Sequence, residues 1–133
     1  MTPDELRALD CWVAEHVMGW ENTTNLHPGT NREWFAPGDG QGEIYSGTTS
    51  RRVLEVTCPP FSTCPADAWA VVERMRALEW CGVIYLKNKA GRYGVEFWHM
   101  DASEDAEGEA WDESWPLAAC LAAKAAIEGR TKE

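Results

Sequence analysis

The sequence predicts an α+β fold in which three helices pack on an antiparallel sheet. Three stretches combine a helix-start signal with apolar residues at helical spacing: residues 3–18, 65–80 and 115–128. Two short apolar runs, 82–86 and 93–98, lie between the second and third helices, and the segment that joins them has a glycine suited to a hairpin loop. Both faces of these runs carry apolar residues, so we expect helices on both sides of the sheet.

The first predicted helix begins with a capping box. Thr2 precedes a proline and Glu5 stands three positions later, so each side chain can bind the other residue's backbone amide. Apolar residues follow at helical spacing, and Gly19 suits the left-handed conformation that ends a helix. His16 lies beside the apolar stripe, and we interpret it as a packing residue rather than a ligand or base.

Residues 21–52 are rich in Asn, Thr, Gly and Pro and predict a long loop with at most a short hairpin. Loops of this length inside a domain are usually functional or mobile. Within it, residues 46–52 hold four hydroxyls and two arginines, in a chain whose formal net charge is −10. Such groups bind phosphate or carboxylate. The alternative interpretation is a polar surface turn that leads into a strand at residues 53–56.

The strongest helix signal lies in residues 59–81. Thr63 is the expected cap, Pro65 fits the first helical turn, and Gly82 is expected to end the helix. Trp69 belongs to the predicted apolar stripe, so we expect it to be buried.

An acidic loop is predicted at residues 101–113, which hold seven acids and no base and so carry −7 of the net charge. It leads to Ser114, the expected cap of the alanine-rich last helix. The residues of that helix expected to face the sheet are Leu117, Cys120, Leu121 and Ile127.

Length and composition indicate one domain spanning residues 1–133, and no apolar run is long enough to cross a bilayer, so we expect a cytoplasmic protein without membrane contact. With 12 Lys and Arg against 22 acids, the chain lacks the basic face that direct nucleic-acid binding needs. Five cysteines without a CxxC motif favour reduced thiols, and a bridge between Cys58 and Cys64 is the alternative.

No motif indicates a metal, a cofactor or catalysis. A calcium loop at residues 101–112 would lack the glycine of its sharp turn. The residues that could serve as zinc ligands have no usual spacing: they are His27, Cys58, Cys64 and His99. A thiol, an imidazole and a carboxylate occur at Cys64, His99 and Asp101 without a local catalytic signature. We therefore expect a non-catalytic protein without cofactors.

Eight tryptophans are many for 133 residues, and we expect some of them to line a groove or an interface. Helix and strand positions predict the core for Trp12, Trp20, Trp69 and Trp98. Loop positions place Trp34, Trp111 and Trp115 nearer the surface.

Three motifs follow one another along the chain: LD and EHVMGW within residues 9–20, PPFST and AWAVVE within 59–73, and PLAACLAA at 116–123. Their order and spacing resemble the phage ABA sandwich domain family, although Cys64 and Pro65 stand where the family continues with an aspartate. The resemblance implies a helix/antiparallel sheet/helix (ABA) sandwich with three main helices, a central β-hairpin and short strands. It also implies a phage or prophage gene, and hence the host cytoplasm. It supplies no catalytic residues.

The first functional hypothesis is a non-catalytic phage accessory protein that sequesters a small anionic, nucleotide-derived host defence signal. Arginines would hold the anion, hydroxyls would donate hydrogen bonds, and aromatic rings would stack. The expected ligand-binding residues are Arg51, Arg52, Ser46, Thr48, Thr49, Ser50, Trp34 and Tyr45.

The alternative is an acidic phage inhibitor or DNA mimic that docks on a basic host protein. Complementary charge would speed association and make it sensitive to salt. The expected partner-binding residues are Asp101, Glu104, Asp105, Glu107, Glu109, Trp111, Asp112, Glu113 and Trp115. The sequence leaves the oligomeric state open, including a homo-oligomer.

Overall fold

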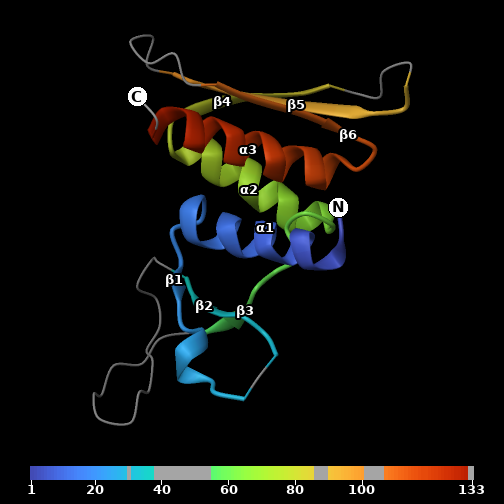
Figure 1. The fold of residues 1–133 in the computed structure, drawn as a ribbon. Coiled ribbons are helices and arrows are strands. Elements are labelled where there is room, and N and C mark those ends of the chain that lie inside the picture. Colours follow the sequence, from blue (N-terminus) through green and yellow to red (C-terminus); the bar gives the residue numbers. More distant parts are fainter. Residues whose placement is uncertain (30, 38–54, 86–89, 101–106, 132–133) are drawn as a thin grey trace.

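The computed structural model describes residues 1–29, 31–37, 55–85, 90–100 and 107–131 (Figure 1), and for residues 130 and 131 it describes the backbone alone. Within these ranges the chain forms three α-helices, one short 3-10 helix and two three-stranded antiparallel sheets, which confirms the predicted α+β class. In chain order the elements are α1 (Pro3–His16), β1 (Glu21–Asn22), η1 (Thr24–Leu26), β2 (Trp34–Ala36), β3 (Val56–Thr57), α2 (Pro65–Ala77), β4 (Trp80–Tyr85), β5 (Tyr93–His99), β6 (Glu107–Asp112) and α3 (Trp115–Thr131).

These elements stack in layers. The sheet β4-β5-β6 lies on α3 and α2, α1 follows, and the small sheet β1-β2-β3 lies beyond α1 (Figure 1). The predicted helix/sheet/helix order is therefore not observed: in the described part of the chain, all helices lie on one side of the larger sheet. The prediction failed because the outward-facing residues of that sheet include acids from a third strand, and acids do not require cover.

The described parts of the two apolar runs pair antiparallel as predicted, with Ile84 opposite Val95 and Gly82 opposite Phe97, while residues 86–89 of the predicted hairpin lie outside the described ranges. The third strand, β6, lies within the acidic stretch that was predicted to be a loop, and it pairs with β5 along its length. Backbone hydrogen bonds to β5 hold this stretch as a strand, although few of its side chains are apolar.

Helix α2 differs from the prediction at both ends. Its cap is Cys64, which makes no side-chain capping bond, while the Thr63 hydroxyl points back to the carbonyl of Pro60. The helix ends at Ala77, well before Gly82, because Glu79 takes up a positive φ of 70° and turns the chain directly into β4. Gly82 is instead a strand residue.

Trp69 is on the surface, with half of its area exposed, so the prediction that it is buried was wrong. The buried residues of α2 are Ala68, Val71 and Met75. Trp69 lies one position beyond Ala68 and outside this stripe, and its ring meets that of Trp115 in a T-shaped arrangement. Trp98, also predicted as core, is 37% exposed, whereas Trp80 is only 3% exposed. Trp12 and Trp20 are half-buried against the core.

The fully buried residues of α3 are small, and of the four residues expected to face the sheet only Cys120 is among them. Leu117, Leu121 and Ile127 are only partly buried. The fully buried residues are Ala118, Ala119, Cys120, Ala122, Ala123 and Ala126. A Cβ atom at Gly108 of β6 would overlap backbone atoms of Ala122 and Ala126, so helix and strand are in direct backbone contact. Only glycine and alanine fit at this approach.

The small sheet occupies part of the segment that was predicted as a loop. Its centre is β2, at the apolar pair Trp34 and Phe35, and Phe35 is fully buried. The strand predicted at residues 53–56 is represented by β3, which begins at Val56; residues 53 and 54 lie outside the described ranges. Across the helices that the structure describes, no segment combines the length and apolarity that a bilayer span requires.

Candidate functional site

The larger sheet has an outward surface that no described element covers. Val95, Phe97 and His99 of β5 are buried, so alternation directs Gly94, Glu96 and Trp98 outward. The strand register then gives the outward positions of the neighbouring strands. We call the full set the outer face: Cys81, Val83 and Tyr85 on β4, Gly94, Glu96 and Trp98 on β5, and Glu107, Glu109 and Trp111 on β6.

Aromatic rings lie ordered on this outer face. Tyr85 and Trp111 stack across Gly94, with ring centroids 5.4 Å apart and planes inclined by 18°. A Cβ atom at Gly94 would lie 2.6 Å from the indole of Trp111, so the ring lies flat against the strand because glycine leaves room for it. Trp98 adds a partly exposed indole further along β5.

Carboxylates are fixed among these rings by hydrogen bonds. The Tyr85 hydroxyl donates to Glu96 at 3.0 Å, and the Trp111 Nε1–H donates to Glu109 at 2.6 Å. The bond to Glu96, together with the charge of that carboxylate, raises the pKa of Tyr85 above its ordinary value. Three of the nine positions hold carboxylates and none holds lysine or arginine, so every charged side chain of the outer face is negative.

Such a surface suits cations attached to flexible chains. Lys and Arg side chains can pair with the carboxylates and lie over the indole rings, whose faces attract positive charge. The rings are already packed, so little side-chain entropy is lost when a partner contacts them.

The predicted partner-binding residues fall into three groups: those on or beside the outer face, those that serve the fold, and those outside the described ranges. Glu107, Glu109 and Trp111 meet on the outer face, and Glu113 is exposed in the turn that follows. Asp112 accepts a hydrogen bond from the Ser114 amide, and the ring of Trp115 packs edge-on against Trp69, 6.5 Å away, so these two serve the fold. The remaining three, Asp101, Glu104 and Asp105, lie outside the described residues.

Sequence reasoning missed Glu96, Trp98 and Tyr85 as members of this surface. The signal was present in the alternation of β5, where Glu96 and Trp98 share one face. It was misread because helices were expected to cover both sides of the sheet.

The predicted anion site cannot be assembled from the described residues. Arg51, Arg52, Ser46, Thr48, Thr49, Ser50 and Tyr45 all lie outside the described ranges. Trp34 is described, and its ring stacks on His27 at 4.4 Å with planes inclined by 23°. One face of this indole is therefore occupied within the fold, and the anion site stays a prediction.

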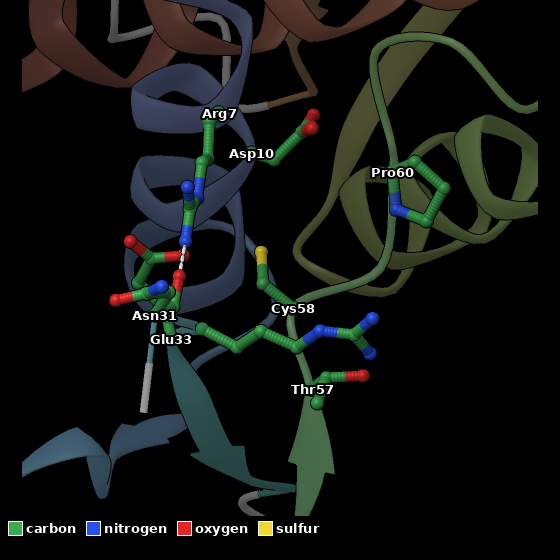
Figure 2. A pocket seen from close by; sticks show the side chains of 8 residues that line it. Arg7, Asp10, Asn31, Glu33, Thr57, Cys58 and Pro60 are labelled. Atoms are coloured by element: carbon green, nitrogen blue, oxygen red, sulfur yellow. Dashed lines mark hydrogen bonds and ion pairs between the residues drawn. The ribbon is translucent and has the colours of Figure 1, made fainter. Parts of the chain in front are cut away.

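A polar pocket of about 420 Å³ lies between α1, the segment before β2, and the segment that begins at the end of β3 (Figure 2). Arg7 forms an ion pair with Glu33 at 2.8 Å and also donates to the Asn31 carbonyl. Asp10 accepts the Ser62 amide hydrogen at 2.8 Å, and burial raises the pKa of its carboxyl. Two arginines and two acids line the pocket, so its charges balance and favour no ionic ligand of either sign. The lining residues are Arg7, Asp10, Asn31, Arg32, Glu33, Thr57, Cys58 and Pro60.

Of the residues considered for catalysis and metal binding, Cys64 and His99 occupy structural positions, while Asp101 and the first half of the calcium loop considered at residues 101–112 lie outside the described ranges. Cys64 caps α2, and His99 is buried at the end of β5 with its ring edge-on to Trp80 at 5.0 Å. His16 is exposed and stacks on Trp12 at 4.7 Å. Among the residues with described positions, no three His, Cys, Asp or Glu side chains are grouped to hold a metal ion.

Comparison with known proteins bears on the family of the chain. A crystal structure of a phage protein from Bacillus cereus has a similar fold, with a TM-score of 0.58, 20% identity, and coverage of 95% of this chain and 92% of the other. At this identity the likeness concerns the fold alone. No curated protein matches the chain. The family model of the phage ABA sandwich domain matches residues 11–124, which include all three helices in part or whole. The chain therefore belongs to the phage ABA sandwich domain family.

Proposed function

We propose that this phage protein is a non-catalytic binding protein that docks on a basic host protein through the outer face of β4-β5-β6. One observation carries the proposal: among the described residues, this face combines three carboxylates and three aromatic rings with no basic side chain and no covering element. Tryptophan and tyrosine are enriched at the centres of protein interfaces, and uniform charge selects partners of the opposite sign.

The arrangement of the rings supports recognition of a protein. Trp98 and Tyr85 expose a third or more of their area although the protein has a core available. Exposed aromatic groups that cluster on one surface usually mark a contact site. The stacked pair of Tyr85 and Trp111 offers a rigid, amphipathic platform beside Glu96 and Glu109.

Overall charge supports the same partner chemistry. The formal net charge of −10 repels nucleic acid and anionic surfaces, while it steers basic proteins toward the molecule. A host protein that itself binds nucleic acid through Lys and Arg would present the complementary surface.

Two matched variants test the proposal. The first, Glu96→Gln with Glu107→Gln and Glu109→Gln, neutralises the outer face while keeping side-chain shape and hydrogen-bond acceptors. The control neutralises three exposed acids elsewhere: Glu21, Glu73 and Glu79. Each triple variant changes the formal net charge from −10 to −7, so general electrostatic effects are equal.

The experiment is a pull-down from host lysate at low and high salt, with the captured protein identified and then purified. We expect the wild type and the control variant to capture the same basic protein at low salt, with less at high salt, and the outer-face variant to lose it. Capture that survives in the outer-face variant, or that involves only acidic proteins, would refute the proposed surface.

A further inference from the structure

The larger sheet has two edge strands, β4 and β6, which differ in charge. Strand β6 carries Glu107, Glu109 and Asp112, whereas β4 contains neither a charged residue nor a proline. Charged side chains and prolines on an edge strand oppose pairing with another chain, and an edge without them is open to such pairing. No described strand pairs with the free side of β4. This free side is called the β4 edge below.

The backbone along the β4 edge presents unpaired hydrogen-bonding groups. The Met100 amide donates to the Glu79 carbonyl at 2.9 Å, so these opposite residues form a hydrogen-bonded pair with the β5 side. Bonded and non-bonded residues alternate in an antiparallel pair, so the odd-numbered residues of β4 bond to β5. The amides and carbonyls of the even-numbered residues Trp80, Gly82 and Ile84 therefore point away from β5, toward the open edge.

An apolar groove of about 540 Å³ lies beside the β4 edge, between the strand and α2. Trp80, Gly82 and Phe97 line it from the sheet, and Val72 and Arg76 line it from the helix. Gly82 is exposed, and a Cβ atom there would lie 2.9 Å from the Phe97 ring, so the missing side chain lets this ring reach the groove. A strand added at this edge would gain backbone hydrogen bonds and apolar contacts together.

We propose that β4 pairs with β4 of a second copy of this chain, antiparallel and about a two-fold axis at Gly82, so that the two sheets become one. The strand is self-complementary in this register, because Trp80 faces Ile84 of the second copy and Gly82 faces Gly82. All three outward-pointing residues of each strand are then opposite one another, and each opposed pair exchanges two hydrogen bonds. Ile84 of the second copy meets Trp80 at the wall of the groove.

Charge favours a second copy at this edge. Each chain has a formal net charge of −10, so two copies need a contact surface that opposes no acids. In this register Cys81 faces Val83 of the second copy, and Glu79, the acid directly before β4, faces Tyr85. A basic partner would find no carboxylate on β4 to pair with. The inference does not rest on the proposed docking surface, although pairing would bring the outer faces of the two copies side by side.

Two charge variants test the register. Cys81→Lys with Val83→Lys sets lysine opposite lysine across the two-fold axis, and like charges directly opposite destabilise a strand pair. Cys81→Glu with Val83→Lys sets glutamate opposite lysine instead. Both positions are half-buried, and circular dichroism checks that each variant folds. The double-lysine variant changes the formal net charge from −10 to −8, so general repulsion between copies falls and cannot explain a loss of pairing.

Ile84→Pro gives an independent variant. The Ile84 amide points away from β5, so the proline removes hydrogen bonds of the dimer and none that hold β4 to β5. This variant should weaken the dimer without separating the strands of one chain.

The experiment is analytical ultracentrifugation of the full-length protein over a range of concentrations. All five cysteines are unbridged in this structure, so a reductant is present throughout. We expect a concentration-dependent dimer for the wild type, and a dissociation constant higher by about tenfold or more for the double-lysine and Ile84→Pro variants. The glutamate–lysine variant should dimerise again. A wild type that stays monomeric at every concentration, or a double-lysine or Ile84→Pro variant that dimerises as well as the wild type, would overturn the inference. A glutamate–lysine variant as weak as the double-lysine variant would overturn the register at Gly82.

Discussion

Gly108 allows α3 to lie in backbone contact with β6. Substitution to alanine would place a methyl group against the backbone of Ala122 and Ala126, which cannot move without shifting the helix. We expect Gly108→Ala to lower the free energy of unfolding by about 3 kcal/mol, the upper part of the range for overpacking. Urea denaturation measures this loss.

Gly94→Ala is the matched control on the other surface of the same sheet. Its methyl group would meet the Trp111 indole, a side chain on the solvent-facing surface that can swing away. We expect a loss of about 1 kcal/mol. Equal losses in the two variants would show that the helix is not held against β6 as described.

Trp80 and Trp69 provide a second pair at the residue scale. Trp80 is 3% exposed and Trp69 is 50% exposed. Truncation of Trp80 to alanine should cost about 3 to 5 kcal/mol, as for other buried large aromatics, whereas Trp69→Ala should cost about 1 kcal/mol. Urea denaturation measures the free energy of unfolding of both variants. A larger loss in Trp69→Ala than in Trp80→Ala would contradict the structure.

Glu55 links stability to pH. Its carboxyl is partly buried, but hydrogen bonds from Thr23 at 2.6 Å and His27 at 2.7 Å outweigh this burial and hold its pKa below the ordinary 4.5. Because the folded pKa is lowered, the carboxylate contributes stability that is fully present above pH 4.5 and is lost as the pH falls through the folded pKa.

We therefore expect Glu55→Gln to lose less stability than the wild type between about pH 6 and about pH 3. Thr23→Val, which removes one of the two donors, should give an intermediate dependence. Urea midpoints measured across this range test the prediction, and parallel curves for the three proteins would count against it.

Local residue signals were reliable where the outcome depends on residues close together in the sequence. Thr2 and Glu5 form the predicted reciprocal capping box, and Gly19 has the expected positive φ of 71°. The position of Trp69 could not be predicted in this way, because burial depends on which stripe of α2 meets α3. That choice is set by tertiary packing rather than by spacing along one helix.

Among the elements, the two threonines predicted as helix caps differ in the structure. Thr2 accepts the Glu5 amide hydrogen, while Thr63 stands outside α2 and contributes no capping bond. Thr2→Ala should cost about 1 kcal/mol of stability, and Thr63→Ala only a few tenths of a kcal/mol. Thermal unfolding of the two variants tests this, and a larger loss in Thr63→Ala would restore the cap inferred from the sequence.

The three helices were recognisable because each has a clear start signal: Thr2 and Pro3 for α1, Pro65 for α2, and Ser114 directly before α3. Strand β6 was not recognisable, since its outward residues Glu107 and Glu109 and its inward residues Gly108 and Ala110 lack the bulky apolar side chains typical of strands. Its place is determined by pairing with β5 and by the close approach of α3, neither of which is a local property.

At the scale of the whole molecule, the layer order determines which surfaces are free to bind. Placing all described helices on one side leaves the outer face open, and β6 brings part of the acidic stretch next to Glu96 and Trp98. The sequence therefore indicated the charge and the aromatic residues of a partner site. It could not indicate the surface, because that depends on the register of three strands.

The most direct test of this account is the affinity of the purified basic partner for three proteins, measured by titration calorimetry at two salt concentrations. We expect the outer-face variant (Glu96, Glu107 and Glu109 to Gln) to bind about tenfold or more weakly than the wild type, with a smaller dependence on salt. The control variant (Glu21, Glu73 and Glu79 to Gln) should bind within about twofold of the wild type. Equal weakening of both variants, or unchanged binding by the outer-face variant, would contradict the claim that this face recognises the partner.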